Sequence, residues 1–281
     1  MINNTYKHET QGLFGKIYTS LCNSTLIRKI RRHLFNLIPF VKLESDVESV
    51  VYLNWLVDTD KVTHLASNGV ELLDLNGKTL LTILTYQHGN FRPSLFNFLK
   101  FLFPSPKQSN WRLYIKSVND AEASGAVLFI KNIMDSLVFT LGTRLSSDVM
   151  LTHYTNHFQH RIADDRIETK IAPSAGSSPA LFSDVSLAKD FNFPNELIAQ
   201  FKSDEEVLKF ICLQHSAYSE GADFDGLCKA DIDLPIDIAT VQPAKVNNLS
   251  MDWLNDIVEG NSPFTFVVPA VKFRVLNEEL L

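Results

Sequence analysis

The sequence predicts an α+β protein built mainly of antiparallel strands that form a barrel or a sandwich. Strand patterns joined by tight turns follow one another from residue 48 to residue 161, and such repeated strands are typical of these two architectures. A helical pattern of apolar and basic residues precedes them at 13–38. Later strand and helix patterns return the chain to the same body, and no internal repeat is visible.

The N-terminal helical pattern consists of apolar residues at three- and four-residue steps, with lysines and arginines on the other faces. The apolar positions are Ile17, Leu21, Leu26, Ile27, Ile30, Leu34, Leu37 and Ile38. The triplet Asn23-Ser24-Thr25 interrupts the pattern, so Ser24 is expected to cap a second helix, and Pro39 is expected to end it. We expect a basic amphipathic helical segment over 1–45 and a single domain over 46–281.

Charge is unevenly distributed along the chain. Residues 1–45 carry seven basic and two acidic side chains, a net charge of +5, so the remainder carries −11 of the total of −6. An acidic body repels phosphates, and nucleic acid is therefore not an expected partner. Two interpretations of the basic helix stay open. Residues 13–38 lie on an anionic membrane surface, or they pack on the body with the basic face against acidic neighbours.

The strand predictions rest on apolar patterns and turn signals. A strand from Glu48 to Val57 is apolar on both faces, as expected for a buried strand. Asn76-Gly77 is a strong hairpin signal, which joins strands over 70–75 and 78–86 after a short helix at 60–65. The other predicted pairs are 110–118 with 126–132 across a longer turn at 119–125, and 149–161 with 166–171 about residues 163–165. A loop at 173–179, helices at 194–212 and 250–257, and strands at 227–234 and 264–275 follow.

Composition narrows the class of protein further. No apolar run approaches the roughly 18–20 residues that span a bilayer, and the N-terminus lacks a secretory pattern. The three cysteines, Cys22, Cys212 and Cys228, fit no metal spacing, and their odd number argues against a disulfide framework. We therefore expect a cytoplasmic protein.

The order and residues of these elements resemble a known family. The stretches VVYLNWLVDTDKVTHLASNGVELLDLNGKTLLTILTYQHGNFRP, NWRLYIK and AVLFIKNIMDSLVFTLGTRL are similar to the YqjF-like bacterial proteins of unknown function, which are grouped in the acetoacetate decarboxylase-like superfamily. The likeness covers most of residues 48–275. It implies a cone-shaped, partly closed β-barrel of mostly antiparallel strands with peripheral helices and an internal cavity for a small molecule, such as an organic acid.

The resemblance also bears on chemistry. Acetoacetate decarboxylases use a lysine that forms a Schiff base beside a second ammonium group. Thr143 and Arg144 stand where that lysine pair would be, and neither side chain forms an imine. Many YqjF-like relatives carry a glutamate at the position of Gln108. The resemblance therefore implies a ligand-binding pocket or a lyase, cyclase or hydrolase without a Schiff-base lysine, and no cofactor is expected.

Candidate ligand-binding residues follow from strand periodicity and from loop positions. Asn110, Arg112 and Tyr114 lie on one face of a strand, and if that face is internal they offer an amide, a cation and a hydroxyl to an anionic or carbonyl ligand. Arg92 ends a strand, where loops over a barrel mouth often contact ligands. Arg144 is a candidate anchor for a carboxylate, and Thr143 and Gln108 complete the set.

Two further features need an interpretation. On a strand, His153 and His157 are about 13 Å apart and His160 points away, so no metal site is expected. Residues 91–106 hold five phenylalanines and three leucines. This segment is interpreted as a lid over the cavity, as a membrane-touching insert, or as a helix packed on the body or between two copies of the chain. A small-molecule ligand is the main expected partner, and a homo-oligomer stays open.

Overall fold

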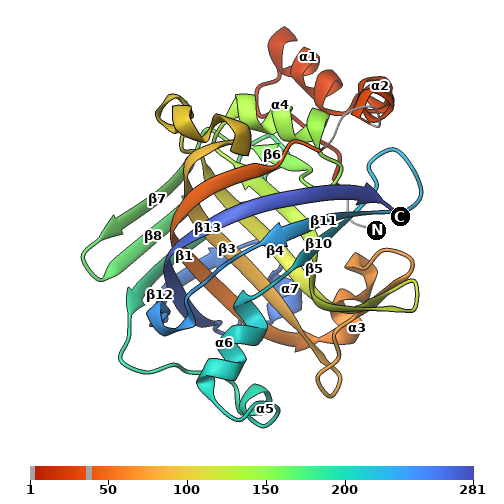
Figure 1. Cartoon of the computed structure of the whole chain (residues 1–281). Helices are drawn as coiled ribbons and strands as arrows, with labels where there is room; N and C mark the ends of the chain where they lie inside the picture. Colours follow the sequence, from red (N-terminus) through yellow and green to blue (C-terminus); the bar gives the residue numbers. More distant parts are fainter. Residues whose placement is uncertain (1–3, 36–39) are drawn as a thin grey trace.

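The structure is a computed structural model, and it describes residues 4–35 and 40–281. One large sheet forms most of the molecule, with helices around it (Figure 1). The strands are β1 (Leu43–Asp58), β2 (Val70–Leu72), β3 (Lys78–Pro93), β4 (Lys107–Val118), β5 (Ala121–Met134), β6 (Thr152–Tyr154), β7 (Phe158–Ala163), β8 (Arg166–Ile171), β9 (Leu181–Leu187), β10 (Ser216–Glu220), β11 (Leu227–Asp233), β12 (Gln242–Met251) and β13 (Phe264–Leu280). The helices are α1 (Leu13–Cys22), α2 (Thr25–Phe35), α3 (Thr59–Val62), η1 (Thr63–Leu65), η2 (Ser94–Leu102), α4 (Leu137–Ser146), α5 (Asn195–Ile198), α6 (Asp204–Cys212), η3 (Ile238–Thr240) and α7 (Asn255–Val258).

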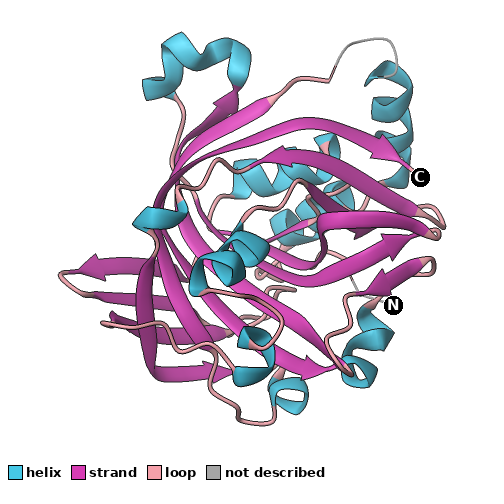
Figure 2. Ribbon diagram, turned by 60° about the horizontal axis from the view of Figure 1, so that its bottom comes forward, coloured by secondary structure: helices cyan, strands magenta, loops and turns pink. Residues whose placement is uncertain are grey.

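Seven strands of the sheet form a closed ring. β1, β3, β4, β5, β10, β11 and β13 are hydrogen-bonded in this order, and β13 pairs back with β1. Beyond β13 the sheet continues through β12, β9, β8 and β7, which extend to one side of the ring (Figure 2). Most pairs are antiparallel, but β5 pairs in parallel with β10 and with β6, so the sheet is mixed. The ring encloses an interior space that is large enough to be considered as a ligand site.

The first strand is longer than predicted and is buried on both faces as predicted. It begins at Leu43, five residues before the expected start at Glu48, because its first residues pair with β13 and with β3. Residues 50–55 are all buried. Their two faces meet two apolar clusters, one inside the ring around Tyr52 and one outside it around Trp55 and Trp111.

Turn residues explain several details of the strand pairing. Asn76 and Gly77 both have positive φ, and Leu75 and Lys78 exchange backbone hydrogen bonds across them, as the predicted hairpin requires. The pairing does not continue from there into β2, which was expected to pair with β3. β3 pairs with β4 only from Leu81, and β2 occupies the free end of β4 instead. The turn between β4 and β5 is also tighter than expected, because Asn119 and Asp120 adopt left-handed conformations and the strand resumes at once.

Several later predictions are confirmed in part. The segment 149–161 is not one strand: β6 and β7 are separate, and the predicted hairpin joins β7 to β8. The helical region 194–212 divides into α5 and α6, and the Ser203 hydroxyl caps α6. The predicted helix at 250–257 is limited to α7, because the residues before it form β12. The strands β9, β10 and β12 were not predicted, although the loop at 173–179 was.

The N-terminal segment forms two helices, as the break at Asn23-Ser24 predicts. The Ser24 hydroxyl accepts a hydrogen bond from the backbone N–H of Ile27, which makes it the cap of α2. The prediction that Pro39 ends the helix lies outside the described residues. Within the described part of the chain, none of the helices combines the length and the apolar character that crossing a bilayer takes.

Candidate functional site

A cavity lies inside the strand ring. Its volume is about 60 Å³, several times the roughly 10–15 Å³ that one water molecule needs. Most of the wall is apolar and comes from β1, β3, β4, β11 and β13. The polar wall residues are Tyr52, Tyr86, Gln108, Asn110, Arg112 and Glu278. Strand periodicity predicted two of these, Asn110 and Arg112, and the family resemblance singled out Gln108. The described lining contains no lysine.

Arg112 is the cation of the cavity, and its guanidinium has no carboxylate partner among the described residues. The residue is 3% exposed. Its Nη2 donates to the Tyr114 hydroxyl at 3.1 Å and to the Ile211 carbonyl at 3.4 Å, whereas its Nε has no partner. The guanidinium carbon lies 5.6 Å from the centre of the Tyr52 ring and 5.4 Å from that of Tyr114. A buried arginine without a counter-ion is energetically unfavourable, and an anion in the cavity would relieve it.

A chain of amides adjoins Arg112 on the same wall. The Asn110 and Gln108 amides both donate to Oδ1 of Asn132, at 2.7 Å and 3.3 Å. Oε1 of Gln108 lies 2.7 Å from Nε2 of His88, so this ring nitrogen is the donor. Burial lowers the pKa of His88 to about 4, and its ring is therefore neutral. Oδ1 of Asn110 stays without a partner, so the wall offers an acceptor as well as the Arg112 donor.

The predicted face of β4 is thus internal, and its three polar residues act together. Asn110 and Arg112 line the cavity, and Tyr114 supports Arg112 from behind, with its hydroxyl donating to the Ile211 carbonyl at 2.7 Å. Burial raises the pKa of Tyr52, Tyr86 and Tyr114. These three phenols are therefore neutral near pH 7 and serve as hydrogen-bonding groups.

Glu278 is a wall residue that sequence reasoning missed, because it lies near the end of the long last strand and far from every motif. Its carboxyl accepts from the Ser147 hydroxyl at 2.5 Å and from the Asp148 backbone N–H at 3.1 Å. Burial raises its pKa to about 7. Its proton is therefore exchanged near neutral pH, which is the property of a general acid or base.

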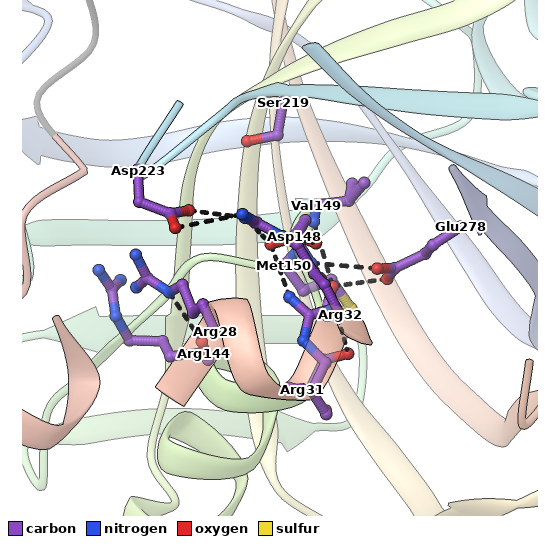
Figure 3. A network of polar contacts seen from close by, with 12 residues as sticks. Arg28, Arg31, Arg32, Arg144, Asp148, Val149, Met150, Ser219, Asp223 and Glu278 are labelled. Atoms are coloured by element: carbon purple, nitrogen blue, oxygen red, sulfur yellow. Dashed lines mark hydrogen bonds and ion pairs between the residues drawn. The ribbon is translucent and has the colours of Figure 1, made fainter. Parts of the chain in front are cut away.

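Asp148 connects this wall to the N-terminal helices. Its carboxylate pairs with Arg31 at 2.6 Å and with Arg32 at 2.7 Å, and Arg32 also pairs with Asp223 (Figure 3). These side chains are largely buried. The interpretation that the basic face of this helix meets acidic neighbours on the body is confirmed.

Thr143 and Arg144 lie outside the cavity lining. Both belong to α4, where the Thr143 hydroxyl lies within hydrogen-bonding distance of the Thr140 carbonyl and of the Thr152 hydroxyl. Arg144 is fully buried, and it donates to the backbone carbonyls of Cys22, Thr152 and Asn4. It therefore holds the N-terminal segment against α4.

Arg92 also lies outside the lining. It is buried and donates to Glu44 at 2.7 Å and to Oδ1 of Asn97 at 2.7 Å. Its guanidinium anchors the start of η2 to β1. None of the residues of η2 is fully buried, although Leu99 is half-buried and η2 contacts β3.

His153 and Lys131 contact each other outside the cavity, whereas His160 lies apart from them, beside Thr169. His153 is fully buried, with Nε2 at 3.2 Å from the Lys131 amine and Nδ1 at 2.7 Å from the Ser177 hydroxyl. Burial and the charge of Arg144 lower the pKa of Lys131 to about 8, and its amine lies over the Trp253 ring, not on the cavity wall. In residues 4–35 and 40–281, no three His, Cys, Asp or Glu side chains are grouped as metal ligands.

The comparisons with known proteins agree with this architecture. Residues 45–254 match DUF2071, a family described as an uncharacterized conserved protein (COG2071). The chain belongs to this family. The expected YqjF-like membership of this DUF2071 protein is thereby confirmed, and the description of the family carries no activity. No curated protein matches the sequence.

Solved structures similar to this DUF2071 protein share its fold. The acetoacetate decarboxylase from Legionella pneumophila has a TM-score of 0.56 at 7% identity, over 85% of this chain and 86% of that one. The enduracididine biosynthesis enzyme MppR complexed with pyruvate has a TM-score of 0.54 at 11% identity, over 85% and 90%. An acetoacetate decarboxylase-like enzyme from Sphingomonas wittichii has a TM-score of 0.53 at 8% identity, over 86% and 94%. At such low identities, the likeness extends to the fold alone.

Proposed function

We propose that this protein binds a small organic acid inside the strand ring, which acts as a partly closed barrel. The observation that carries the proposal is Arg112, a buried cation on the cavity wall with an unpartnered Nε and no ion pair to any carboxylate of the described residues. A ligand carboxylate would supply the missing charge, and charge-assisted hydrogen bonds of this kind are among the strongest in proteins. The free Oδ1 of Asn110 would accept from a hydroxyl or a protonated group of the same ligand.

The size and chemistry of the cavity support a short acid. A volume of about 60 Å³ admits a molecule of few heavy atoms, and the remaining wall is mostly apolar. Two structures of similar fold are named for ligands of this class: MppR is complexed with pyruvate, and the Legionella enzyme is an acetoacetate decarboxylase. Both ligands are short oxo acids, and they set the chemistry of the first compounds to test.

Glu278 favours catalysis as a second candidate function. It lines the same cavity and has a pKa of about 7, so it would transfer a proton to or from an acid held by Arg112. Arg112 would stabilise negative charge developing on an oxo acid. A Schiff base is not part of the proposal, because the described cavity lining contains no lysine.

The test is binding of pyruvate and other short oxo acids to the purified protein, measured by native mass spectrometry and calorimetry. Each acid is paired with its neutral amide. We expect the acids to bind and the amides to bind at least about tenfold more weakly, because the amides lack the charge that Arg112 needs. Equal binding of acids and amides, or binding that persists in Arg112→Met, would refute an Arg112–carboxylate contact.

The same compounds separate an enzyme from a binding module. After incubation with each bound acid, nuclear magnetic resonance would detect solvent deuterium entering the acid or carbon dioxide leaving it. Turnover that Glu278→Gln abolishes without loss of affinity supports the catalytic role. If the wild-type protein binds the acid but neither deuterium exchange nor release of carbon dioxide is detected, the protein is a binding module.

We also place the protein in the cytoplasm. Cys22, Cys212 and Cys228 are all buried and unpaired in disulfides, which suits a reducing compartment. A redox-sensitive fluorescent reporter fused to the protein would test this placement, because its fluorescence in living cells shows whether the compartment is reducing.

A further inference from the structure

Large apolar side chains are exposed on three helices at one end of the molecule. They belong to α1, α2 and η2, with one more from α4. We call them the apolar end: Leu13, Phe14, Ile17, Leu26, Ile30, Leu34, Leu95, Phe96, Phe98, Phe101, Leu102 and Val138. Phe98 and Phe101 are 75% and 72% exposed, and Leu13 is 76% exposed. Apolar groups gathered in this way mark a surface that binds a partner or a membrane.

The three helices lie at the same end of the strand ring. In Figure 1, α1 and α2 stand at the upper right and η2 at the upper left, with α4 between them, and Figure 2 also shows η2 and α2 at one end. α4 packs against both α1 and α2. At its other side, the Phe139 ring of α4 stacks on Phe91 at 5.3 Å, just before η2. α4 therefore joins the two exposed areas into one surface.

Buried polar contacts hold these helices with their apolar faces outward. Arg28 and Arg32 of α2 point into the body, where Arg28 donates to the Cys22 carbonyl and Arg32 pairs with two aspartates (Figure 3). A helix on the surface of a globular protein ordinarily turns its apolar face toward the core and its charged face toward water. η2 is held by Arg92, whose guanidinium binds Asn97. The exposure of the apolar end is thus a consequence of anchored structure.

Charge indicates what this surface binds. The segments that build it, residues 10–43, 91–106 and 136–147, contain no aspartate or glutamate, although the chain has 32 acidic residues. Lys16, Lys29 and Lys42 of the same segments are exposed, and Lys100 is exposed and pairs with Asp46 of β1 at 3.6 Å. Apolar groups flanked by lysines complement a bilayer with anionic headgroups. Two copies joined through this end would instead bring like charges together.

We propose that the apolar end docks on the surface of an anionic lipid bilayer. Phe98 and Phe101 of η2 and the apolar face of α1 and α2 enter the boundary between headgroups and acyl chains, while Lys16 and Lys29 contact the headgroups. In this orientation, one end of the strand ring faces the membrane. The proposal is independent of what the cavity binds.

The experiment is sedimentation of the full chain with vesicles of phosphatidylcholine alone and of equimolar phosphatidylcholine and phosphatidylglycerol. We expect binding to the anionic vesicles and little to the neutral ones. Phe98→Ser with Phe101→Ser is expected to lower the partition coefficient at least about tenfold, because two phenyl groups no longer leave water. Lys16→Gln with Lys29→Gln is expected to lower it about tenfold or more and to reduce its dependence on salt.

The matched control is Ile198→Ser, which removes an exposed apolar side chain from α5 at the opposite end (Figure 1). It is expected to bind vesicles like the wild type. All substituted side chains are exposed, so thermal unfolding checks that each variant keeps its stability. Absence of vesicle binding by the wild type, or equal losses in the control, would overturn the proposal. It is equally overturned if light scattering shows a lipid-independent dimer that Phe98→Ser with Phe101→Ser dissociates.

Discussion

Replacing Arg112 by methionine is the most direct test of the cavity. The two side chains are of similar length, so methionine fills the same space without the charge. In the wild-type protein the guanidinium is buried, its Nε is unpartnered, and it forms no ion pair with a carboxylate of the described residues. Arg112 is therefore expected to contribute more to ligand affinity than to the stability of the fold.

The expected change in stability follows from the contacts. Methionine removes an unsatisfied buried donor, whose burial costs about 1–3 kcal/mol. It also forfeits the two hydrogen bonds from Nη2 to Tyr114 and to the Ile211 carbonyl, each contributing about 0.5–1.5 kcal/mol. The Ile211 carbonyl keeps the Tyr114 hydroxyl as its donor. These contributions nearly cancel, so the free energy of unfolding should change by no more than about 1 kcal/mol.

Affinity should change much more than stability. A charge-assisted hydrogen bond contributes about 1.5–3 kcal/mol, so the Kd of the tightest-binding acid is expected to rise about 10- to 150-fold in Arg112→Met. Urea denaturation followed by tryptophan fluorescence gives the free energy of unfolding. Calorimetric titration with the same acid gives the Kd.

Arg144→Met is the matched control. Arg144 is also a buried arginine, but its guanidinium donates to three backbone carbonyls, at 2.6 to 3.2 Å. Leaving these acceptors unsatisfied should lower the free energy of unfolding by about 3 kcal/mol or more. The reasoning is refuted if Arg112→Met loses as much stability as Arg144→Met while its affinity for the acid is unchanged.

Two further predictions concern pH and backbone conformation. The pKa of Glu278 is raised from 4.5 to about 7, so between these values the folded protein holds a proton that the unfolded chain has released. The free energy of unfolding should therefore fall as the pH rises through this window. Urea denaturation at pH 5 and at pH 8 should show a smaller fall for Glu278→Gln than for the wild type. An equal fall in the two proteins would contradict the raised pKa. Gly77 has a φ of +84°, and Gly77→Ala should lower the free energy of unfolding by about 1–2 kcal/mol. Gly142 lies inside α4, and a Cβ added there would meet open space, so Gly142→Ala should raise the free energy of unfolding by about 0.5–1 kcal/mol. A gain in stability at both sites would contradict the left-handed turn at Gly77.

Local patterns in the sequence predicted what depends on local physics. The two-residue period of β4 placed Asn110, Arg112 and Tyr114 on one face, and the structure brings all three together. The helix break at Ser24 was predicted for the same reason, because a capping hydroxyl acts on a residue three positions away. Such features depend only on neighbouring residues, so they do not change with the packing of distant parts of the chain.

Pairing between distant strands was less predictable. The Asn76-Gly77 turn formed as expected, yet β2 pairs with β4, because the partner of a short strand depends on which edge the longer strands leave free. Thr143 and Arg144 were placed by resemblance to a lysine pair, and they lie in a helix outside the cavity lining. At 7–11% identity to the similar structures, positions cannot be matched reliably through sequence.

The sequence by itself determined the sheet-rich α+β class, the family, the common face of Asn110, Arg112 and Tyr114 on β4, and the concentration of basic residues at the N-terminus. The closure of the strand ring decided that this face is internal. Only the tertiary structure decided that Glu278 joins Arg112 in one cavity, since β13 comes beside β1 only when the ring closes. It also decided that the arginines of α2 turn inward. Asp148 and Asp223 lie more than a hundred residues along the chain from α2, and their carboxylates attract the basic face to the body, which leaves the apolar face exposed.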